Sequence, residues 1–414
     1  MQLNKQKPLR KLLTAATSTL LAGTAQQGMA APTNDYQLDT AFLYYAEKDR
    51  ITVFEPVVKL RKEVGDDEFI GAKLVLDTMS GASPNGAIAT DSPQTFSSPS
   101  GETTYTTPAG ETPLDPTFRD LRVALSADWE KPLSNHLKGI FGANISTERD
   151  YSSIGISASF AQDLNQRNTT LTAGFSLGRD DVSPMGGMPV GLTPVSVGEG
   201  EDDDDEGGAS KDIQEFLLGV TQVLGSRTLL QVNYTMTNEQ GYLTDPYKLL
   251  SVLDNTGELR ATDPYLYEKR PDNRQRQALY VKAVHQFGED VLHAAFRHYT
   301  DDWGVTSQTY DFHYRFELAG GRHYLQPHYR YYEQSKADFY YYNLEDGNIP
   351  TYASADYRLA DMSTTTFGLK YGMVLGEYHE FGMRLESMKQ QAEGDAPFED
   401  NTAIILQLNY SHVF

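Results

Sequence analysis

The sequence predicts an all-β fold, namely a closed antiparallel transmembrane β-barrel of about 16 strands, with roughly 14–18 as the range. Three observations predict it. Apolar and polar residues alternate along most of the chain, the connections fall into a short class and a long class, and the chain ends in an alternating strand that closes on Phe414. Alternation with a period of two suits a wall that has lipid on one side and water on the other.

The N-terminus, residues 1–30, has the features of a secretory signal peptide. Four basic residues precede a short apolar stretch at 12–22, and Gly28-Met29-Ala30 supplies small residues for cleavage. An uncleaved membrane anchor is the alternative, but the apolar stretch is short for a membrane helix. We therefore expect cleavage near Ala31, export, and a barrel over residues 31–414.

Alternation then recurs without a helical period. It is clear in the segments 121–130, 154–160, 171–177, 230–236, 308–318, 324–332, 366–373 and 403–414. The clearest hairpin joins 308–318 to 324–332 through the Gly320-Gly321 turn, and Pro327 predicts a bulge in its second strand. In the last strand His412 departs from the pattern, because an apolar residue is usual there.

Connections on one side of the predicted barrel are short turns, such as those near 65–67, 165–168 and 288–290. Connections on the other side include every long one: 80–116, 182–211, 239–273, 335–360 and 391–401. Short periplasmic turns and long extracellular loops are typical of outer-membrane barrels. A soluble β-sandwich is the alternative, but it needs no such asymmetry. The loops 182–211 and 335–360 are long enough to contain an extra hairpin.

Composition excludes several classes of protein. The mean hydropathy of -0.50 is too polar for a helical membrane protein, and the 26 Tyr and 18 Phe suit aromatic girdles. The chain has 0 Cys, so we expect neither a lipid-anchored cysteine nor disulfides. A net charge of -22 argues against nucleic acid as a partner. Charges on the predicted inner face nearly balance, which predicts no strong ion selectivity.

The most notable inward-facing group mixes imidazoles and guanidiniums on neighbouring strands. Histidines on adjacent strands can bind a transition metal, and His with Arg can hold an anion. The plainer interpretation, which we favour, is a charge ladder along a hydrated wall, with Asp311 and Glu317 as partners. The group comprises His293, Arg297, His313, Arg315, His328 and Arg330.

An acidic run lies within the connection 182–211. Several carboxylates together can bind a hard cation such as Ca²⁺, but the run lacks the spacing of a calcium loop. A solvated loop whose charges repel one another is the favoured interpretation. The run includes Glu201, Asp202, Asp203, Asp204, Asp205 and Glu206.

Four phrases resemble an uncharacterised family of Gram-negative outer-membrane proteins, the domain of unknown function 3570. They are 77–86, 270–274, 331–340 and 354–359, and the resemblance runs from about Gln37 to Phe414. It implies a barrel that acts with small periplasmic redox proteins or lipoproteins. Because these phrases lie where strands meet loops, charged pairs between them can fold the loops over the lumen. The residues concerned are Arg270, Arg274, Asp338, Asp356 and Arg358.

The expected function is a porin-like channel for small solutes or ions in the outer membrane of a Gram-negative bacterium. The first alternative is a plugged barrel that serves as a scaffold or sleeve for a periplasmic redox or metal-handling partner. The second is a barrel enzyme, which is not expected, because no Ser stands beside an inward His in an obvious base relationship. Beyond lipid and small solutes, periplasmic proteins are the only partners considered, and no cofactor is expected.

Overall fold

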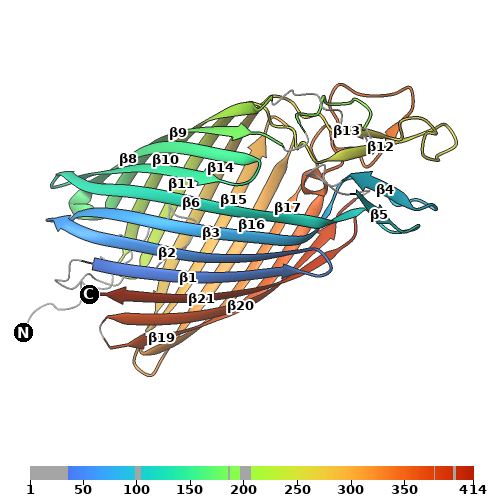
Figure 1. Ribbon diagram of the computed structural model, residues 1–414. Helices are drawn as coiled ribbons and strands as arrows, with labels where there is room; N and C mark the ends of the chain where they lie inside the picture. Colours follow the sequence, from blue (N-terminus) through green and yellow to red (C-terminus); the bar gives the residue numbers. More distant parts are fainter. Residues whose placement is uncertain (1–35, 98–103, 185–186, 196–206, 377, 395–397) are drawn as a thin grey trace, which may run out of the picture.

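A computed structural model describes residues 36–97, 104–184, 187–195, 207–376, 378–394 and 398–414. Sixteen strands of this part form one closed antiparallel barrel, as the sequence predicted (Figure 1). The predicted signal peptide and the acidic run 201–206 lie outside the described residues. The described residues contain no helix long and apolar enough to cross a membrane.

The barrel strands follow one another around the ring in chain order. They are β1 (Tyr36–Glu47), β2 (Ile51–Gly65), β3 (Glu68–Pro84), β6 (Leu114–Ser134), β7 (Leu137–Thr147), β8 (Tyr151–Leu164), β9 (Thr169–Val182), β10 (Ala209–Gly225), β11 (Thr228–Gly241), β14 (Asn273–Phe287), β15 (Asp290–Asp301), β16 (Thr306–Leu318), β17 (His323–Gln334), β19 (Met362–Leu375), β20 (His379–Ala392) and β21 (Asn401–Val413).

The ring closes between the first and last strands. β1 pairs with β21 from Gln37 opposite Val413 to Glu47 opposite Ala403. Tyr36 and Phe414 exchange backbone hydrogen bonds of 3.1 and 2.9 Å, and their rings stack with centroids 5.6 Å apart. The C-terminal aromatic residue therefore seals the seam at the end of the barrel that carries the short turns (Figure 1).

Apolar residues cover the outer face of the barrel and remain exposed. Leu218 and Phe367 are each 61% exposed and Ile156 is 58% exposed, whereas the alternate residues of the same strands point inward. An apolar belt this continuous is stable against lipid and not against water. The chain is therefore an outer-membrane β-barrel.

Pro327 does not produce the predicted bulge. His313 pairs with His328 on one side of it and Phe316 with Leu325 on the other, so the register is unchanged. Proline removes one donor from the ladder, and here the pairing is interrupted over two positions and resumes in the same register. The expectation of a bulge was wrong because a missing hydrogen bond does not require an extra residue.

The long connections carry most of the remaining structure. β4 (Gln94–Ser97) and β5 (Thr104–Thr107) form a hairpin between β3 and β6, beyond the end of the barrel (Figure 1). β12 (Leu249–Leu253) pairs with β13 (Tyr265–Tyr267) and, in parallel, with β18 (Leu344–Glu345). The loop 335–360 thus contributes a single strand to a shared sheet and no hairpin of its own. It also contains a 3-10 turn, η2 (Tyr357–Leu359), and a second one, η1 (Asn165–Arg167), joins β8 to β9.

Three of these connections share buried apolar cores. One core joins Phe96 and Tyr105 of the β3–β6 connection to Leu249 and Tyr265 of the β11–β14 connection. A second joins Leu250, Val252 and Leu266 of the β11–β14 connection to Leu344, Ala353 and Ala355 of the β17–β19 connection. Around the ring, four strands lie between the anchoring strands β6 and β11, two between β14 and β17, and four between β19 and β3. Loops that begin so far apart on the ring can share a core only if they extend across the mouth of the barrel. We call the three connections together, β3–β6, β11–β14 and β17–β19, the cap.

Candidate functional site

Three histidines lie in one row across neighbouring strands of the barrel wall. The register places His293 of β15 opposite His313 of β16, and His313 opposite His328 of β17. Counting outward from the Gly320-Gly321 turn gives the same pairing, so the arrangement follows from the hairpin register. The row continues through Gly368 of β19 to Glu386 of β20.

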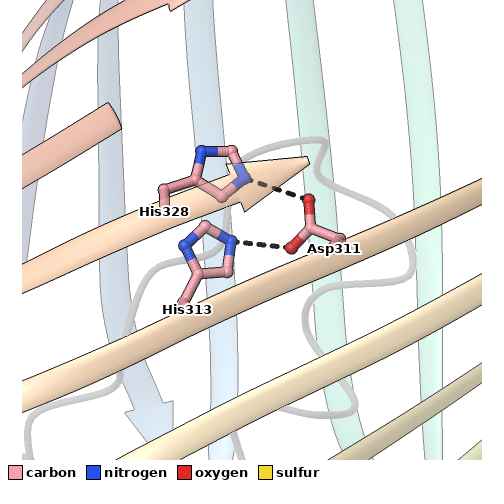
Figure 2. A group of neighbouring side chains, drawn as sticks. All are labelled: Asp311, His313 and His328. Carbon is pink, nitrogen blue, oxygen red and sulfur yellow. Dashed lines mark hydrogen bonds and ion pairs between the residues drawn. The ribbon is translucent and has the colours of Figure 1, made fainter. Parts of the chain in front are cut away.

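Asp311 joins two of these histidines. Its Oδ1 lies 2.8 Å from His313 Nε2 and its Oδ2 lies 3.2 Å from His328 Nε2, as Figure 2 shows. The two imidazole rings stack with centroids 4.0 Å apart and an interplanar angle of 11°. The side chains of His313 and Asp311 are partly open to the lumen, at 22% and 23% exposure, and His328 is nearly buried.

His328 has a second carboxylate on its other side. Its Nδ1 lies 2.7 Å from Glu386 Oε1, and because a carboxylate only accepts, the imidazole Nδ1–H donates. Glu386 reaches His328 across β19 because Gly368 lies between them. A Cβ on Gly368 would lie 2.6 Å from Glu386 Cγ, so any larger residue displaces this carboxylate.

The three predicted arginines surround this group at greater distance. Arg330 Nη1 lies 4.0 Å from Asp311 Oδ2 and its side chain is half exposed. Arg315 pairs with Glu317 of its own strand and lies 3.7 Å from the ring centroid of Tyr324. Arg297 lies over the ring of Tyr299. None of these contacts places a guanidinium between the two stacked imidazoles.

Positive charge is concentrated on this part of the wall. Inward-facing basic residues on β14 to β20 are Arg274, Arg276, Lys282, Arg297, Arg315, Arg330, Lys370 and Arg384, whereas the inward acids there are Asp301, Asp311, Glu317, Glu380 and Glu386. The charges expected to nearly balance over the whole lumen therefore include a local excess of positive charge on these strands. Solutes with an acidic group can bind such a wall, and a soft or borderline cation can bind its imidazoles.

The wall of β8 and β9 has a different lining. β8 lies eight strands from β19 in the ring of sixteen, so it faces the basic wall across the lumen. Over residues 153–159 its inward side chains are small, and so are those of β9 over residues 170–178. They include Ser153, Gly155, Ser157, Ser159, Thr170, Thr172, Gly174, Ser176 and Gly178.

The predicted loop contacts are partly present. Arg270 Nη2 lies 2.9 Å from Asp356 Oδ2, and Arg358 binds Asp356 through Nε at 2.9 Å, so these three residues join two loops of the cap. Arg274 instead pairs with Asp301 at 2.5 Å and lies over the ring of Trp303. Asp338 lies against Gly304, and its backbone N–H donates to the Trp303 carbonyl at 2.8 Å.

Burial controls the electrostatics of this contact. Burial raises the pKa of Glu268 to about 7, even though Arg270 Nε lies 2.6 Å from its Oε1. Burial alone would also raise the pKa of Asp356, but Arg358, Lys248 and Arg270 outweigh it and hold that pKa well below its ordinary range. Lys248 donates to the backbone oxygen of Pro84, which ties the third loop to the other two.

Sequence reasoning missed Glu386 and Glu268 as members of these two groups. A partial signal existed for Glu386, because Gly368 is an inward glycine that an alternating strand does not require. No local signal marks Glu268, whose fully buried carboxylate also accepts from Asp245 N–H and the Ser354 hydroxyl.

Comparison with known proteins identifies one matching family model. It is described as Protein of unknown function (DUF3570) and matches residues 10–412. No curated protein sequence matches the chain.

Solved structures of outer-membrane proteins align with most of the chain at low sequence identity. A bacterial polysaccharide outer membrane secretin aligns with a TM-score of 0.47 and 10% identity, over 92% of this chain and 99% of that one. Pseudomonas aeruginosa OccK3 (OpdO) aligns with a TM-score of 0.41 and 10% identity, over 92% and 96%. Pseudomonas aeruginosa OccK2 (OpdF), in complex with glucuronate, aligns with a TM-score of 0.41 and 10% identity, over 94% and 100%.

Proposed function

The chain belongs to the family described as Protein of unknown function (DUF3570), as its loop phrases predicted, and we propose that it is a channel for small hydrophilic solutes. The solutes cross the outer membrane of a Gram-negative bacterium by diffusion through the barrel. The proposal assigns no catalytic residue and no cofactor. We also propose that the chain is exported with a signal peptide that is then cleaved.

The observation that carries the proposal is the lining of the lumen. A barrel of sixteen strands is wide enough for an aqueous channel unless side chains or loops fill it. Here the wall of β8 and β9 carries small polar residues and glycines, and it faces a wall of Arg, Lys and His. Small side chains on one wall leave room for water and solute, and the basic wall supplies contacts for acidic groups.

The cap determines what reaches this lumen. Because three long loops meet across the mouth, a solute must pass between them or wait until they separate. The cap therefore sets the size cutoff, and the buried Arg270–Asp356 pair holds it in place. Acidic groups in the loops repel anions at the mouth, so the basic wall acts on solutes that have already entered.

Vesicle swelling in isosmotic solutes tests the proposal. Vesicles that contain the folded protein should swell in small sugars and small organic acids, at rates that fall with solute size. Ser157→Trp, which adds bulk to the small-residue wall, should slow entry several-fold. Ala158→Trp places the same bulk on the adjacent, outward-facing position and serves as the matched control. Swelling no faster than in protein-free vesicles for the smallest solutes would refute the channel.

A closed barrel that acts as a scaffold or sleeve for a periplasmic redox or metal-handling partner is the second candidate. The folded cap favours it, because a mouth covered by packed loops suits a barrel that transmits no solute alone. Capture of one periplasmic protein by the folded barrel, without swelling in any solute, would support this function over the channel.

A further inference from the structure

Three ligand atoms converge on the lumen wall at the spacing of a metal site. Asp311 offers a carboxylate oxygen, and His313 and His328 each offer Nε2, all within 4.8 Å of one another. Four ligands at about 2.0–2.1 Å from Zn²⁺ in a tetrahedron lie roughly 3.3 Å from each other. The distances from Asp311 to the two Nε2 atoms, 2.8 and 3.2 Å, are already close to that value.

The stacking places the Nε2 atoms of both rings beside Asp311, since the ring centroids are 4.0 Å apart and the two Nε2 atoms lie 2.8 and 3.2 Å from its two oxygens. Each Nε2 becomes a metal ligand when it gives up the proton that it donates to Asp311. A neutral imidazole with one N–H bonded presents a lone pair at its other nitrogen. Neutral imidazole is the form in which histidine binds metals.

Glu386 provides the support that metal-binding histidines usually have. It accepts the Nδ1–H of His328 and therefore directs Nε2 toward Asp311 and His313. Gly368 is the gap through which Glu386 reaches this position. Figure 2 shows both imidazoles on the same side of Asp311, each directed at a different oxygen of its carboxylate.

We propose that Asp311, His313 and His328 bind one divalent transition-metal ion at the lumen wall, with Glu386 orienting His328. Two imidazoles and one carboxylate favour Zn²⁺, Ni²⁺ or Cu²⁺ over Mg²⁺ or Ca²⁺, which require oxygen ligands. The fourth position faces the lumen and takes water or an anionic solute.

Neighbouring cations limit the affinity. Arg330 Nη1 lies 4.0 Å from Asp311, and Arg384 Nε lies 3.8 Å from Glu386. Their charge opposes that of the metal, so the ion exchanges with the lumen. The bound ion also displaces protons that His313 and His328 hold toward Asp311, so its binding releases protons.

Isothermal titration of the detergent-folded, full-length barrel with ZnCl₂ tests the site. We expect one Zn²⁺ per chain, heats that depend on the ionisation enthalpy of the buffer, and no comparable binding of Mg²⁺. His313→Gln, His328→Gln and Asp311→Asn should each weaken Zn²⁺ binding at least tenfold. Glu386→Gln should weaken it about 10- to 100-fold through the orientation of His328.

The chain contains its own control. His379 and His412 also stack, with centroids 4.3 Å apart, but within the described residues their ring nitrogens contact the Tyr410 hydroxyl and the Tyr378 carbonyl and not a carboxylate. His379→Gln should leave the Zn²⁺ affinity unchanged. Heat-modifiable migration on gels establishes that each variant is folded. Affinity that is unchanged in folded His313→Gln and His328→Gln, or lowered equally in His379→Gln, would overturn the site.

The effect of the ion on current rests on the proposed channel. Zn²⁺ added to a bilayer with open channels should lower the current of the wild type and leave that of His328→Gln unchanged. Zn²⁺ binding without any current in any variant would refute the channel and keep the site. Current that Zn²⁺ does not affect, with no Zn²⁺ binding by titration, would refute the site and keep the channel.

Discussion

Arg270→Ala should loosen the cap without unfolding the barrel. Arg270 is the cation between two carboxylates that are almost completely buried: Asp356 is 1% exposed and Glu268 is fully buried. Removal of one partner from a buried ion pair costs about 3–5 kcal/mol when a carboxylate is left without its cation, which here is Glu268, because Arg358 still pairs with Asp356. The same free energy should appear as easier local opening, roughly a hundredfold to a few thousandfold.

Hydrogen exchange measures this opening directly. The backbone amides of Lys269 and Ala353 each donate to the other residue's carbonyl at 2.9 Å, so their bonds join two loops of the cap. The protection of these two amides from hydrogen exchange should fall roughly a hundredfold to a few thousandfold in Arg270→Ala. Amides in the middle of β9 should keep theirs, because the barrel ladder does not depend on the cap.

Arg260→Ala is the matched control. Arg260 pairs with Asp346 at 2.9 Å and joins the same two loops, but Asp346 is half exposed. A solvent-exposed pair contributes about 0–1 kcal/mol, so protection should fall no more than about fivefold. Equal losses in the two variants, or no loss in Arg270→Ala, would refute the assignment of the buried pair as the contact that holds the cap.

Three further outcomes follow from burial, lipid contact and close packing. Burial holds the pKa of Glu268 near 7, above its ordinary 4.5, so the folded cap keeps a proton that the opened cap releases. Its stability should therefore rise as the pH falls from about 7 to 4.5, measured by exchange corrected for intrinsic rates, and Glu268→Gln should remove this slope. Phe175→Arg should cost about 2–4 kcal/mol in urea unfolding from vesicles, whereas Ser176→Arg on the adjacent lumen-facing position should cost much less. Gly372→Ala should lower the temperature at which the folded gel band is lost, because its Cβ would overlap the buried Tyr324 ring; an unchanged temperature would contradict that packing.

The sequence determines strand positions and faces because a membrane wall imposes one rule on every strand. Residues such as Ile154 and Phe367 face lipid wherever they occur, so alternation shows both the strand and its orientation. The short turn at Gly320-Gly321 fixes the hairpin register, and with it the pairing of His313 and His328. These features depend only on near neighbours in the chain.

Contacts across several strands or between loops could not be predicted in this way. Glu386 reaches His328 over a strand that lies between them, which requires two registers and the absence of a side chain at Gly368. Arg274 pairs with Asp301 at the end of the adjacent strand β15, whereas the expected long-range partner, Asp356, pairs with Arg270. Arg270 and Arg274 carry the same charge near the same loop, so only the fold of the cap determines which of them pairs with Asp356.

Single-channel recording in planar bilayers tests the central claim, that water and ions pass through this capped barrel, most directly. The wild type should give discrete, stable current steps, and Arg270→Ala should give larger steps or more time in the open state. A membrane that contains folded wild-type and Arg270→Ala protein and still passes no current would contradict the account.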